Sequence, residues 1–319
     1  MPPADQADGL AGGATCPQCG AIIRRQRHVD YLASACERGQ ETNAYVLEFD
    51  RRFRRMLQEP EFHALADLRH LRKEVSEAMA VVQELGPHLR SARRPLIVDC
   101  CCGVGTSTAL LAAAFQPQAS VLGIDRNAAL LAQAHYLQAG GAGAGGGEGA
   151  EEPPRHGMVA CDIHDAAPEL RRRISSGGPE HVAVVAVHAC GLLALGAIDL
   201  FVEAVRAGGS VSSASLVLVP CCIPSAKISP VVAEASAAGA DPYERWCAKL
   251  AAEATVAAGA GVQCSWRRDP LIASERNALV CATWSREAAS AVAAGAAPAP
   301  PDVPAAVERG HLQRRRLVR

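Results

Sequence analysis

Apolar and polar residues alternate in blocks along the middle of the chain, and the blocks follow two different periods. Short runs of Val, Leu and Ile are separated by longer segments in which apolar residues recur every three or four positions. The first pattern is typical of buried strands and the second of amphipathic helices. Their regular alternation predicts an α/β fold in which helices cover both faces of a parallel sheet. The predicted strands are 95–100, 120–125, 157–161, 182–188, 213–220, 261–266 and 278–284, and the predicted helices between them are 105–115, 127–138, 166–174, 193–207 and 242–258.

The predicted α/β body is flanked and interrupted by segments of different composition. The pattern from Thr42 to about Arg90 is helical, and we expect Gly86 and Pro87 to end its last helix. The last two predicted strands follow each other closely, so one of them should run antiparallel. The predicted organisation is a disordered start with a small zinc-binding segment (1–41), a helical extension (42–90), an α/β body (91–287) with a flexible Gly-rich insertion (139–156), and a disordered tail (288–319).

The composition limits the classes of protein to which the chain can belong. At 49% hydrophobic residues in a chain of 319, a sizeable core can form, and because aromatic residues make up only 4%, Ala, Val and Leu must fill it. A net charge of −1 provides no overall attraction to nucleic acid, although it allows local basic patches. The N-terminus resembles neither a signal nor a transit peptide, and no apolar run is long enough for a membrane span. We therefore expect 13 cysteines with free thiols in the cytoplasm or nucleus, and no membrane contact.

The segment IVDCCCGVG (97–105) carries the clearest chemical signal. A strand that passes through a glycine turn into a helix forms a ligand site at the carboxyl edge of a parallel sheet. Here Asp99 precedes the turn, and Gly103 and Gly105 lie within it. The next predicted strand ends in Asp125, about where such a unit presents an acid to a ribose. The sequence therefore predicts a cofactor that contains a nucleoside.

The turn differs from a dinucleotide-binding turn, because the third glycine of G-x-G-x-x-G is missing. Asp99 would also repel a pyrophosphate and attract a cationic amino group. These two points disfavour a pyridine-nucleotide oxidoreductase.

The pattern resembles the S-adenosylmethionine (SAM)-dependent methyltransferase superfamily over residues 70–285. The resemblance implies the Rossmann-like, seven-stranded, doubly wound sheet of class I methyltransferases, with an N-terminal helical extension. Cysteine stands where the family usually has its first glycine, so we expect a turn of slightly different shape. The resemblance implies that SAM is held by Asp99, Cys101, Gly103, Gly105, Asp125 and, in the segment VACDIHD, Asp162.

Histidine and cysteine residues, which are candidate catalytic groups, lie at the ends of the fourth and fifth predicted strands. We expect both strands to neighbour the first, so that His188, Cys190, Cys221 and Cys222 meet the cysteines of the turn at one edge. The motifs HACG (188–191) and PCC (220–222) resemble a superfamily subgroup that includes tRNA 2′-O-methyltransferases and the methyltransferase domain of the glutathione S-transferase C-terminal-domain-containing protein. LRKEVSEA (71–78) is similar to a basic helix with Glu in that subgroup.

His188 and Cys190 are the candidate catalytic residues. Methyl transfer depends mainly on alignment of the nucleophile with the methyl carbon. His188 could accept a proton or orient the acceptor, or it could cap the strand end by hydrogen bonds. The cysteines have three interpretations: small apolar packing residues, a thiolate nucleophile, or a cluster of thiols that binds a soft metal or arsenic.

Cys16, Cys19, His28 and Cys36 form a possible zinc site near the N-terminus. The spacing between His28 and Cys36 is two helical turns, roughly 12 Å in an unbroken helix. One zinc ion cannot span that distance. Either the helix breaks near residues 33–35, or another group supplies the fourth ligand; the alternative is a pair of reduced thiols without metal.

Basic residues in RRFRRM (51–56) and RHLRK (69–73) are usually a solvated helix face. With a possible zinc segment they also fit an RNA acceptor, and the resemblance implies tRNA. The leading hypothesis is a SAM-dependent methyltransferase of RNA. The alternatives are a methyltransferase of a small molecule or a protein, and a non-catalytic binding module on a degenerate fold. Nothing in the sequence indicates an oligomeric state.

Overall fold

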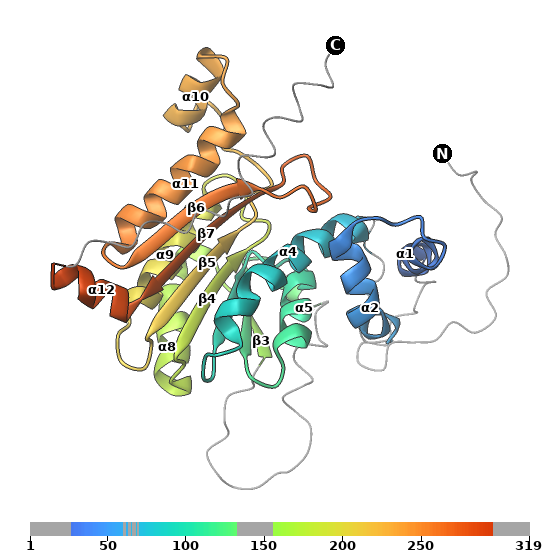
Figure 1. The fold of residues 1–319 in the computed structure, drawn as a ribbon, viewed down its shortest axis with the longest axis horizontal. Coiled ribbons are helices and arrows are strands. Elements are labelled where there is room, and N and C mark those ends of the chain that lie inside the picture. The colour runs from blue at the N-terminus through green and yellow to red at the C-terminus, as the bar shows by residue number, and fades with distance from the viewer. Residues whose placement is uncertain are drawn as a thin grey trace, which may run out of the picture.

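A seven-stranded sheet forms the centre of the computed structural model, which describes residues 27–59, 62, 65, 68, 70–132 and 156–295 (Figure 1). The strand order is β3-β2-β1-β4-β5-β7-β6. Strand β7 is antiparallel to both its neighbours, and the other described pairings are parallel. This is the predicted doubly wound sheet. The strands are β1 (Leu96–Cys100), β2 (Ser120–Asp125), β3 (His156–Ala160), β4 (His181–Ala186), β5 (Ser213–Leu218), β6 (Val262–Arg268) and β7 (Ala278–Ser285).

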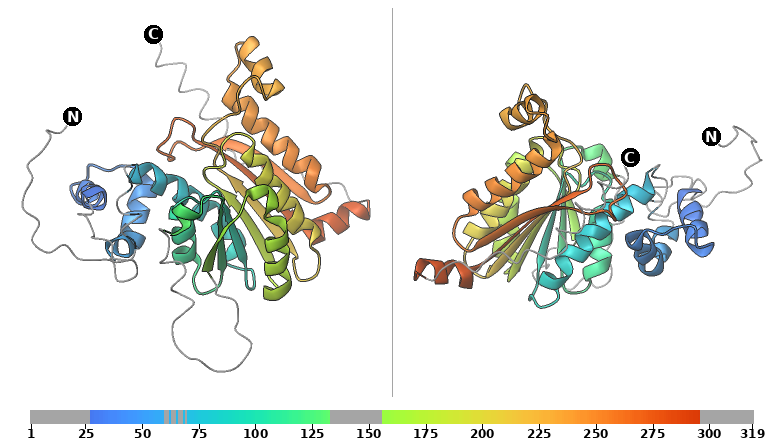
Figure 2. Two further views of the ribbon diagram at one scale, coloured as in Figure 1. Left: turned by 180° about the vertical axis from the view of Figure 1, so that it is seen from behind. Right: turned by 45° about the horizontal axis from the view of Figure 1, so that its top comes forward.

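Helices cover both faces of the sheet (Figure 2). Strand β1 is buried along its whole length because its side chains alternate between two hydrophobic cores. Ile97 packs in the core under α4 (Leu71–Leu89) and α5 (Thr106–Phe115), whereas Leu96 and Val98 pack in the core under α8 (Ala167–Gly177), α9 (Leu193–Arg206) and α11 (Pro242–Ala258).

The N-terminal helices α1 (Arg27–Glu37) and α2 (Ala44–Gln58) lie beside α4 and extend the first core (Figure 1). Asn43 begins α2, because its side-chain oxygen accepts hydrogen bonds from the N–H groups of Tyr45 and Val46. Two short elements, α6 (Ala128–Leu131) and the 3₁₀ turn η3 (Ile163–Asp165), follow β2 and β3.

Helix α4 corrects two expectations. It does not end at Gly86 and Pro87 but runs to Leu89, with Pro87 inside its last turn. Near a helix end, proline removes only one hydrogen bond, and the N–H of Arg90 still donates to the carbonyl of Gly86. Since α4 packs on α5 and on the sheet, it belongs to the α/β body rather than to a separate extension ending at residue 90.

Two helices were not predicted, α10 (Pro230–Ala237) and α12 (Arg286–Ala293). The latter shows that the segment expected as a disordered tail from residue 288 begins with helix. Its Ala289 lies against Gly261, where a Cβ would come within 2.6 Å of the Ala289 nitrogen. The glycine therefore allows the close approach. The predicted start (1–26), most of the insertion (139–155) and the rest of the tail (296–319) lie outside the described residues.

The neighbours of β1 also differ from the expectation. β1 pairs with β2 and β4, and β5 pairs with β4 and β7. The fifth strand is therefore one strand further from the glycine turn than we expected.

Candidate functional site

The carboxyl ends of β1, β2 and β4, together with the connection after β3, surround two adjoining hollows that share His188. We call the first the acid-lined hollow and the second the glycine-turn hollow. The acid-lined hollow is bordered by Cys101, Ile124, Asp125, Arg126, Cys161, Asp162, Ile163, His188, Cys190 and Leu193. The glycine-turn hollow is bordered by Leu68, Glu74, Cys102, Gly103, Val104, Thr106, Ser107, Val187 and His188.

The turn after β1 contains three residues in the left-handed region. Cys101 has φ 57°, Gly103 has φ 57° and Gly105 has φ 82°. Cysteine thus takes the conformation that a glycine adopts freely, at a cost of about 1–2 kcal/mol. We expected a turn of different shape, but Cys101 has a left-handed φ instead, so this residue gives no structural support to the degenerate-fold alternative.

Asp125, the last residue of β2, is hydrogen-bonded to this turn. Its Oδ2 accepts a hydrogen bond from the N–H of Gly103 at 2.9 Å, and its Oδ1 accepts one from the N–H of Asn127 at 2.8 Å. Each carboxylate oxygen has a second lone pair, so Asp125 can still accept hydroxyl groups from a ligand in the acid-lined hollow.

The acid-lined hollow combines carboxylates with apolar walls. Asp162 caps η3 by accepting the N–H of His164, and it borders the hollow together with the apolar residues Ile124 and Leu193. A nucleoside needs both kinds of surface, acceptors for its hydroxyl and amino groups and apolar contact for its base. The residues present therefore fit the adenosine part of SAM.

Asp99 has a different place from the one predicted. Its side chain is fully buried and borders neither hollow; Oδ2 accepts hydrogen bonds from the hydroxyls of Ser107 and Thr108, both at 2.6 Å. Burial raises the pKa of this carboxyl to about 6, although the hydrogen bonds from the two hydroxyls lower the pKa and so act in the opposite direction. Asp99 thus holds the first turn of α5, and does not reach a ligand in either hollow. Gly105 likewise begins α5 outside the walls of both hollows.

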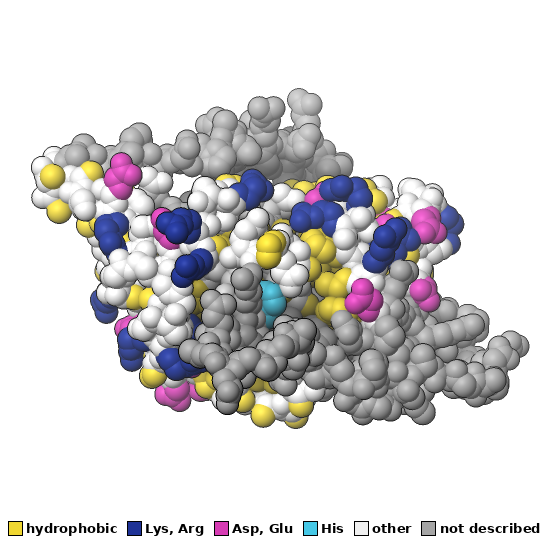
Figure 3. Space-filling view, turned by 90° about the horizontal axis from the view of Figure 1, so that it is seen from below, with side chains coloured by type: hydrophobic (Ala, Val, Ile, Leu, Met, Phe, Trp, Pro, Cys, Tyr) yellow, Lys and Arg dark blue, Asp and Glu magenta, His cyan; other side chains and the backbone are white. Residues whose placement is uncertain are grey.

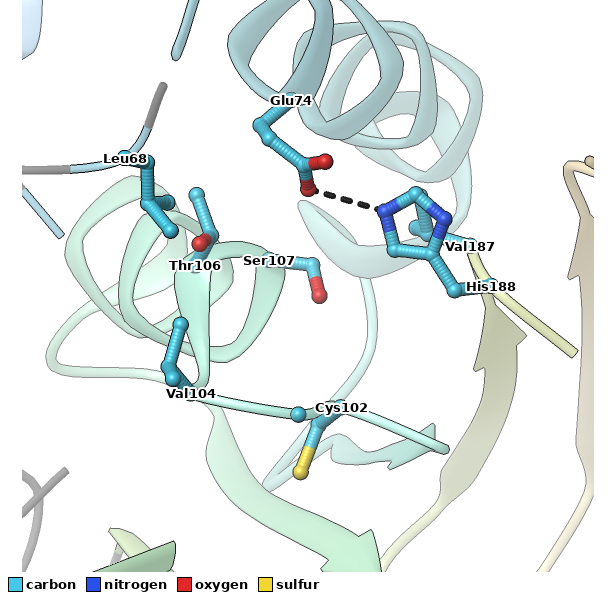
Figure 4. A pocket seen from close by; sticks show the side chains of 9 residues that line it. Leu68, Glu74, Cys102, Val104, Thr106, Ser107, Val187 and His188 are labelled. Carbon is cyan, nitrogen blue, oxygen red and sulfur yellow. Dashed lines mark hydrogen bonds and ion pairs between the residues drawn. The ribbon is translucent and has the colours of Figure 1, made fainter. Parts of the chain in front are cut away.

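His188 is held by a carboxylate that the predicted site did not include. Its Nε2 lies 2.8 Å from Oε2 of Glu74 on α4 (Figure 4). The same Nε2 lies 3.6 Å from Oε2 of Glu77. Burial by itself lowers the pKa of His188, but the hydrogen bond to Glu74 and the charges of both glutamates outweigh it and raise the pKa. Glu74 therefore fixes the ring orientation and leaves Nδ1 pointing away from the pair.

Lys73 completes this group. Its ammonium lies 2.9 Å from Oε2 of Glu77, whose side chain is fully buried and whose Oε1 has no partner among the described residues. Burial raises the pKa of Glu77, although Lys73 and His188 oppose the shift. Because a cation already pairs with Glu77, the cluster of Glu74, Glu77 and His188 does not need a metal ion. The resemblance of LRKEVSEA was the signal in the sequence for these residues.

Cys190, Cys221 and Cys222 meet as predicted, and of the turn cysteines Cys101 borders the acid-lined hollow with Cys190, whereas Cys100 and Cys102 lie elsewhere. The three thiols lie within 4.8 Å of one another. Cys100 is buried in the second core, and Cys102 borders the glycine-turn hollow.

Two members of the predicted N-terminal zinc set lie on one helix. Helix α1 is continuous from Arg27 to Glu37, so it does not break near residues 33–35, and positions 28 and 36 are roughly 12 Å apart along its axis. Of the two expectations, a broken helix and another group as the fourth ligand, only the second is left. Cys36 packs against the first core, and burial raises the pKa of its thiol. Cys16 and Cys19 lie outside the described residues.

The arginines of α2 are mostly paired with acids on the helix and its neighbour. Arg51 and Arg52 contact Glu48, and Arg54 contacts Asp50 and Glu37. Figure 3 shows a face of the molecule on which Lys and Arg are interspersed with Asp and Glu. The basic stretch 51–56 is therefore mainly a solvated, charge-balanced face.

Within the described part of the chain, no helix is both long and apolar enough to cross a membrane.

Comparison with known proteins identifies a domain in the chain. Residues 71–227 match the model of a family described as "Methyltransferase domain", and no curated protein matches the sequence. The match begins with α4 and includes the glycine turn, both strand-end acids and His188.

Solved structures resemble the fold at low identity. Cofactor-bound Rv0187 from MTB is 16% identical with a TM-score of 0.42, over 77% of this chain and 99% of that one. The CurJ carbon methyltransferase is 14% identical with a TM-score of 0.39, over 82% and 65%. The precorrin-6y C5,15-methyltransferase of Geobacter metallireducens GS-15 is 11% identical with a TM-score of 0.34, over 65% and 88%. These likenesses carry no argument about the acceptor.

The family match covers the residues that border both hollows, apart from Leu68. Residues 71–227 therefore constitute a methyltransferase domain, and with it the chain is a SAM-dependent methyltransferase.

Proposed function

We propose that SAM binds across the two hollows and that the enzyme methylates RNA, with tRNA as the expected acceptor. The observation that carries the proposal is the position of His188, which borders both hollows, whereas Asp125 and Asp162 border only one. A cofactor with a nucleoside at one end and an amino acid at the other requires such a pair of connected sites.

The chain supplies binding groups at each end. Asp125 would accept the ribose hydroxyls, and Asp162 would accept the amino group of the adenine. Ile163 and Leu193 provide apolar contact for the base. In the glycine-turn hollow the backbone at Gly103 leaves open space, since a Cβ there would meet no atom within 4 Å. SAM supplies an activated methyl group when it is bound.

His188 is placed to receive the proton that a hydroxyl or amine acceptor loses. Nε2 faces the carboxylate of Glu74, so the neutral ring keeps its hydrogen on Nε2 and its lone pair on Nδ1. In Figure 4, the other ring nitrogen points away from Glu74. The acceptor proton would therefore move to Nδ1, and the carboxylate of Glu74 would stabilise the resulting imidazolium.

Support for an RNA acceptor comes from cations at this edge rather than from α2. Arg126 borders the acid-lined hollow and is exposed, and within the described residues no acid pairs with it. Arg276 lies beside the thiols, since its Nη1 donates to the carbonyl of Cys221 at 3.0 Å. Lys227 is exposed on the connection that follows β5, and no described acid pairs with it either. Such cations can contact phosphates around a bound nucleotide.

The test combines cofactor binding with a survey of acceptors. Calorimetry should show SAM binding to the full chain, and Asp125→Asn should weaken it at least about 10-fold, because one hydroxyl contact to a charged acceptor contributes about 1.5–3 kcal/mol. Asp199→Asn on the exposed face of α9 is the control and should bind as the parent does. The absence of SAM binding would contradict the enzyme site itself.

Labelled methyl groups then identify the acceptor. Full-length enzyme and labelled SAM are incubated with RNA, protein and small-molecule fractions of a cell extract, and RNase treatment should release the incorporated label. Label found only in protein or in small molecules would contradict the RNA acceptor and leave SAM binding intact. Lys227→Gln should lower incorporation into RNA without changing the affinity for free SAM by more than about 2-fold, because Lys227 is exposed and borders neither hollow.

A further inference from the structure

Three thiols converge at the edge of the sheet without a role in the function proposed above. Cys190 follows β4, and Cys221 and Cys222 follow β5. The Sγ atoms of Cys190 and Cys221 are 2.8 Å apart, and those of Cys221 and Cys222 are 3.7 Å apart. All three sulfur atoms lie within 4.8 Å of one another, although the two segments are separated by 31 residues in sequence.

Packing does not account for this group. Cys100, Cys247 and Cys281 are buried members of the hydrophobic cores, as the apolar interpretation of the cysteines expects. By contrast, Cys190 is exposed, and none of the three clustered thiols belongs to either core in the described part of the chain. Cys221 and Cys222 are half-buried but lie outside both cores, so packing in a core does not explain why the three sulfur atoms converge.

The backbone holds the thiols together. The N–H of Gly191 donates to the carbonyl of Cys222 at 3.4 Å, which joins the two connections directly. The hydroxyl of Tyr243 donates to the carbonyl of Pro220 at 2.7 Å, and the guanidinium of Arg276 donates to the carbonyl of Cys221. The two segments are therefore fixed relative to each other before any ligand arrives.

The spacing suits a thiophilic cation. Zn–S bonds of about 2.3 Å in a tetrahedral site place the sulfur atoms about 3.8 Å apart. The separation of Cys221 and Cys222 already has this value, and Cys190 would need to move by about 1 Å from Cys221. Three sulfur ligands leave the fourth position of a tetrahedral ion open, and Cys190 borders the acid-lined hollow.

The charges around the three sulfur atoms are compatible with a bound Zn²⁺ ion. Three thiolates and one Zn²⁺ carry a net charge of −1. The ammonium of Lys73, which also pairs with Glu77, interacts favourably with the negative charge of both Cys190 and Cys221. Because cysteine binds a metal ion as the thiolate, binding releases up to three protons to the buffer.

We propose that Cys190, Cys221 and Cys222 bind one Zn²⁺ ion with an open coordination position at the edge of the acid-lined hollow. This site is separate from the N-terminal cysteines, and it does not depend on the identity of the methyl acceptor.

Metal titration of the reduced full chain tests the proposal. The parent for the experiment is the double variant Cys16→Ser/Cys19→Ser, which removes the other thiol pair. Cd²⁺ is added to this metal-free protein, and the ultraviolet charge-transfer absorption of Cd–thiolate bonds is followed, with Zn²⁺ as competitor. We expect one equivalent of Cd²⁺ per chain to bind and Zn²⁺ to displace it.

Single substitutions to serine identify the ligands. C190S, C221S and C222S should each weaken Cd²⁺ binding by more than about 100-fold, because the loss of outer contacts alone costs a metal site about 10–100-fold. The matched control is C264S on β6, which is far from the cluster in strand order and should bind as the parent does. Zn²⁺ should also raise the melting temperature of the parent but not that of C221S.

Two results would overturn the proposal. One is a reduced parent that shows no Cd–thiolate absorption at one equivalent. The other is unchanged affinity in all three serine variants. Far-ultraviolet circular dichroism of each metal-free variant confirms that it is folded, and calorimetry with SAM on the metal-free parent tests the proposed function independently.

Discussion

The carboxylate of Glu74 lies 2.8 Å from Nε2 of His188, across 114 residues of sequence. The pair joins α4 to the carboxyl end of β4, at the point where the two hollows meet. Lys73 and Glu77 surround it, so the histidine is oriented by a network and not by a single contact. Helix α4 is therefore part of the candidate site as well as of the core.

Removing the carboxylate of Glu74 should affect turnover more than cofactor binding. We expect Glu74→Ala to lower kcat about 100-fold and Glu74→Gln about 10-fold, because the amide oxygen can still accept the Nε2 hydrogen but carries no charge. His188→Ala should abolish turnover with SAM affinity unchanged. Steady-state kinetics and calorimetry separate the two effects. Glu253→Gln on the surface of α11 is the control, and simultaneous loss of SAM binding in the His188 variant would indicate a structural role.

Two substitutions in the turn after β1 should change the free energy of unfolding in opposite directions. Cys101→Gly relieves the strain at φ 57° but adds chain entropy to the unfolded state, so we expect a gain of about 0.5–1 kcal/mol in the free energy of unfolding. Gly105→Ala, at φ 82°, should lower it by about 1 kcal/mol. Urea denaturation measures both. A loss of stability in Cys101→Gly would show that the thiol makes contacts worth more than the strain.

Asp99 should prove to be a structural residue. Thr108 is fully buried and donates to Asp99 at 2.6 Å. Thr108→Val keeps its shape and removes this hydrogen bond to a buried acid, so we expect a loss of about 1–3 kcal/mol of stability. SAM affinity should stay within about 2-fold of the parent, measured by calorimetry. Thr255→Val on the exposed part of α11 is the control; lost SAM affinity without lost stability would return Asp99 to the cofactor site.

His181 should make folding depend on pH. Burial, with a smaller contribution from His88, lowers the pKa of its ring to about 4, and the ring lies within hydrogen-bond distance of Ser213 and Ser215. Between about pH 4 and 6.5 the unfolded chain therefore binds a proton that the folded chain does not. Stability should rise with pH across this window, by up to about 3 kcal/mol, and level off above it.

The variant His181→Gln isolates this contribution. Urea denaturation at several pH values should give a flatter curve for the variant than for the parent between pH 4 and 6.5. Parallel curves would mean that His181 titrates alike in the folded and unfolded chains. Asp99, whose pKa is raised, acts in the opposite direction below about pH 6, and it is common to both proteins, so it cancels in the difference.

The pattern of apolar residues predicted helices and strands well in segments where it follows either the helical or the strand period clearly. Strand β2 and helix α11 have the predicted bounds, since an apolar run and a Pro-led amphipathic segment leave few alternatives. The patterns failed where helices are short and rich in alanine, as in α10 and α12, and at Pro87, whose effect depends on its position within the turn. The neighbours of β5 could not be derived from the order of strands along the chain.

For the site, the sequence by itself determined which chemical groups stand at the strand ends: the glycine turn, Asp125, Asp162, His188 and the thiols. It did so because parallel strands bring their carboxyl ends to one edge. Only the tertiary structure decided which way each group faces. It turned Asp99 into the interior, where the hydroxyls of α5 compensate its burial, and it brought Glu74 to His188. The contact between Glu74 and His188 joins residues 114 positions apart in the chain, and no local pattern records it.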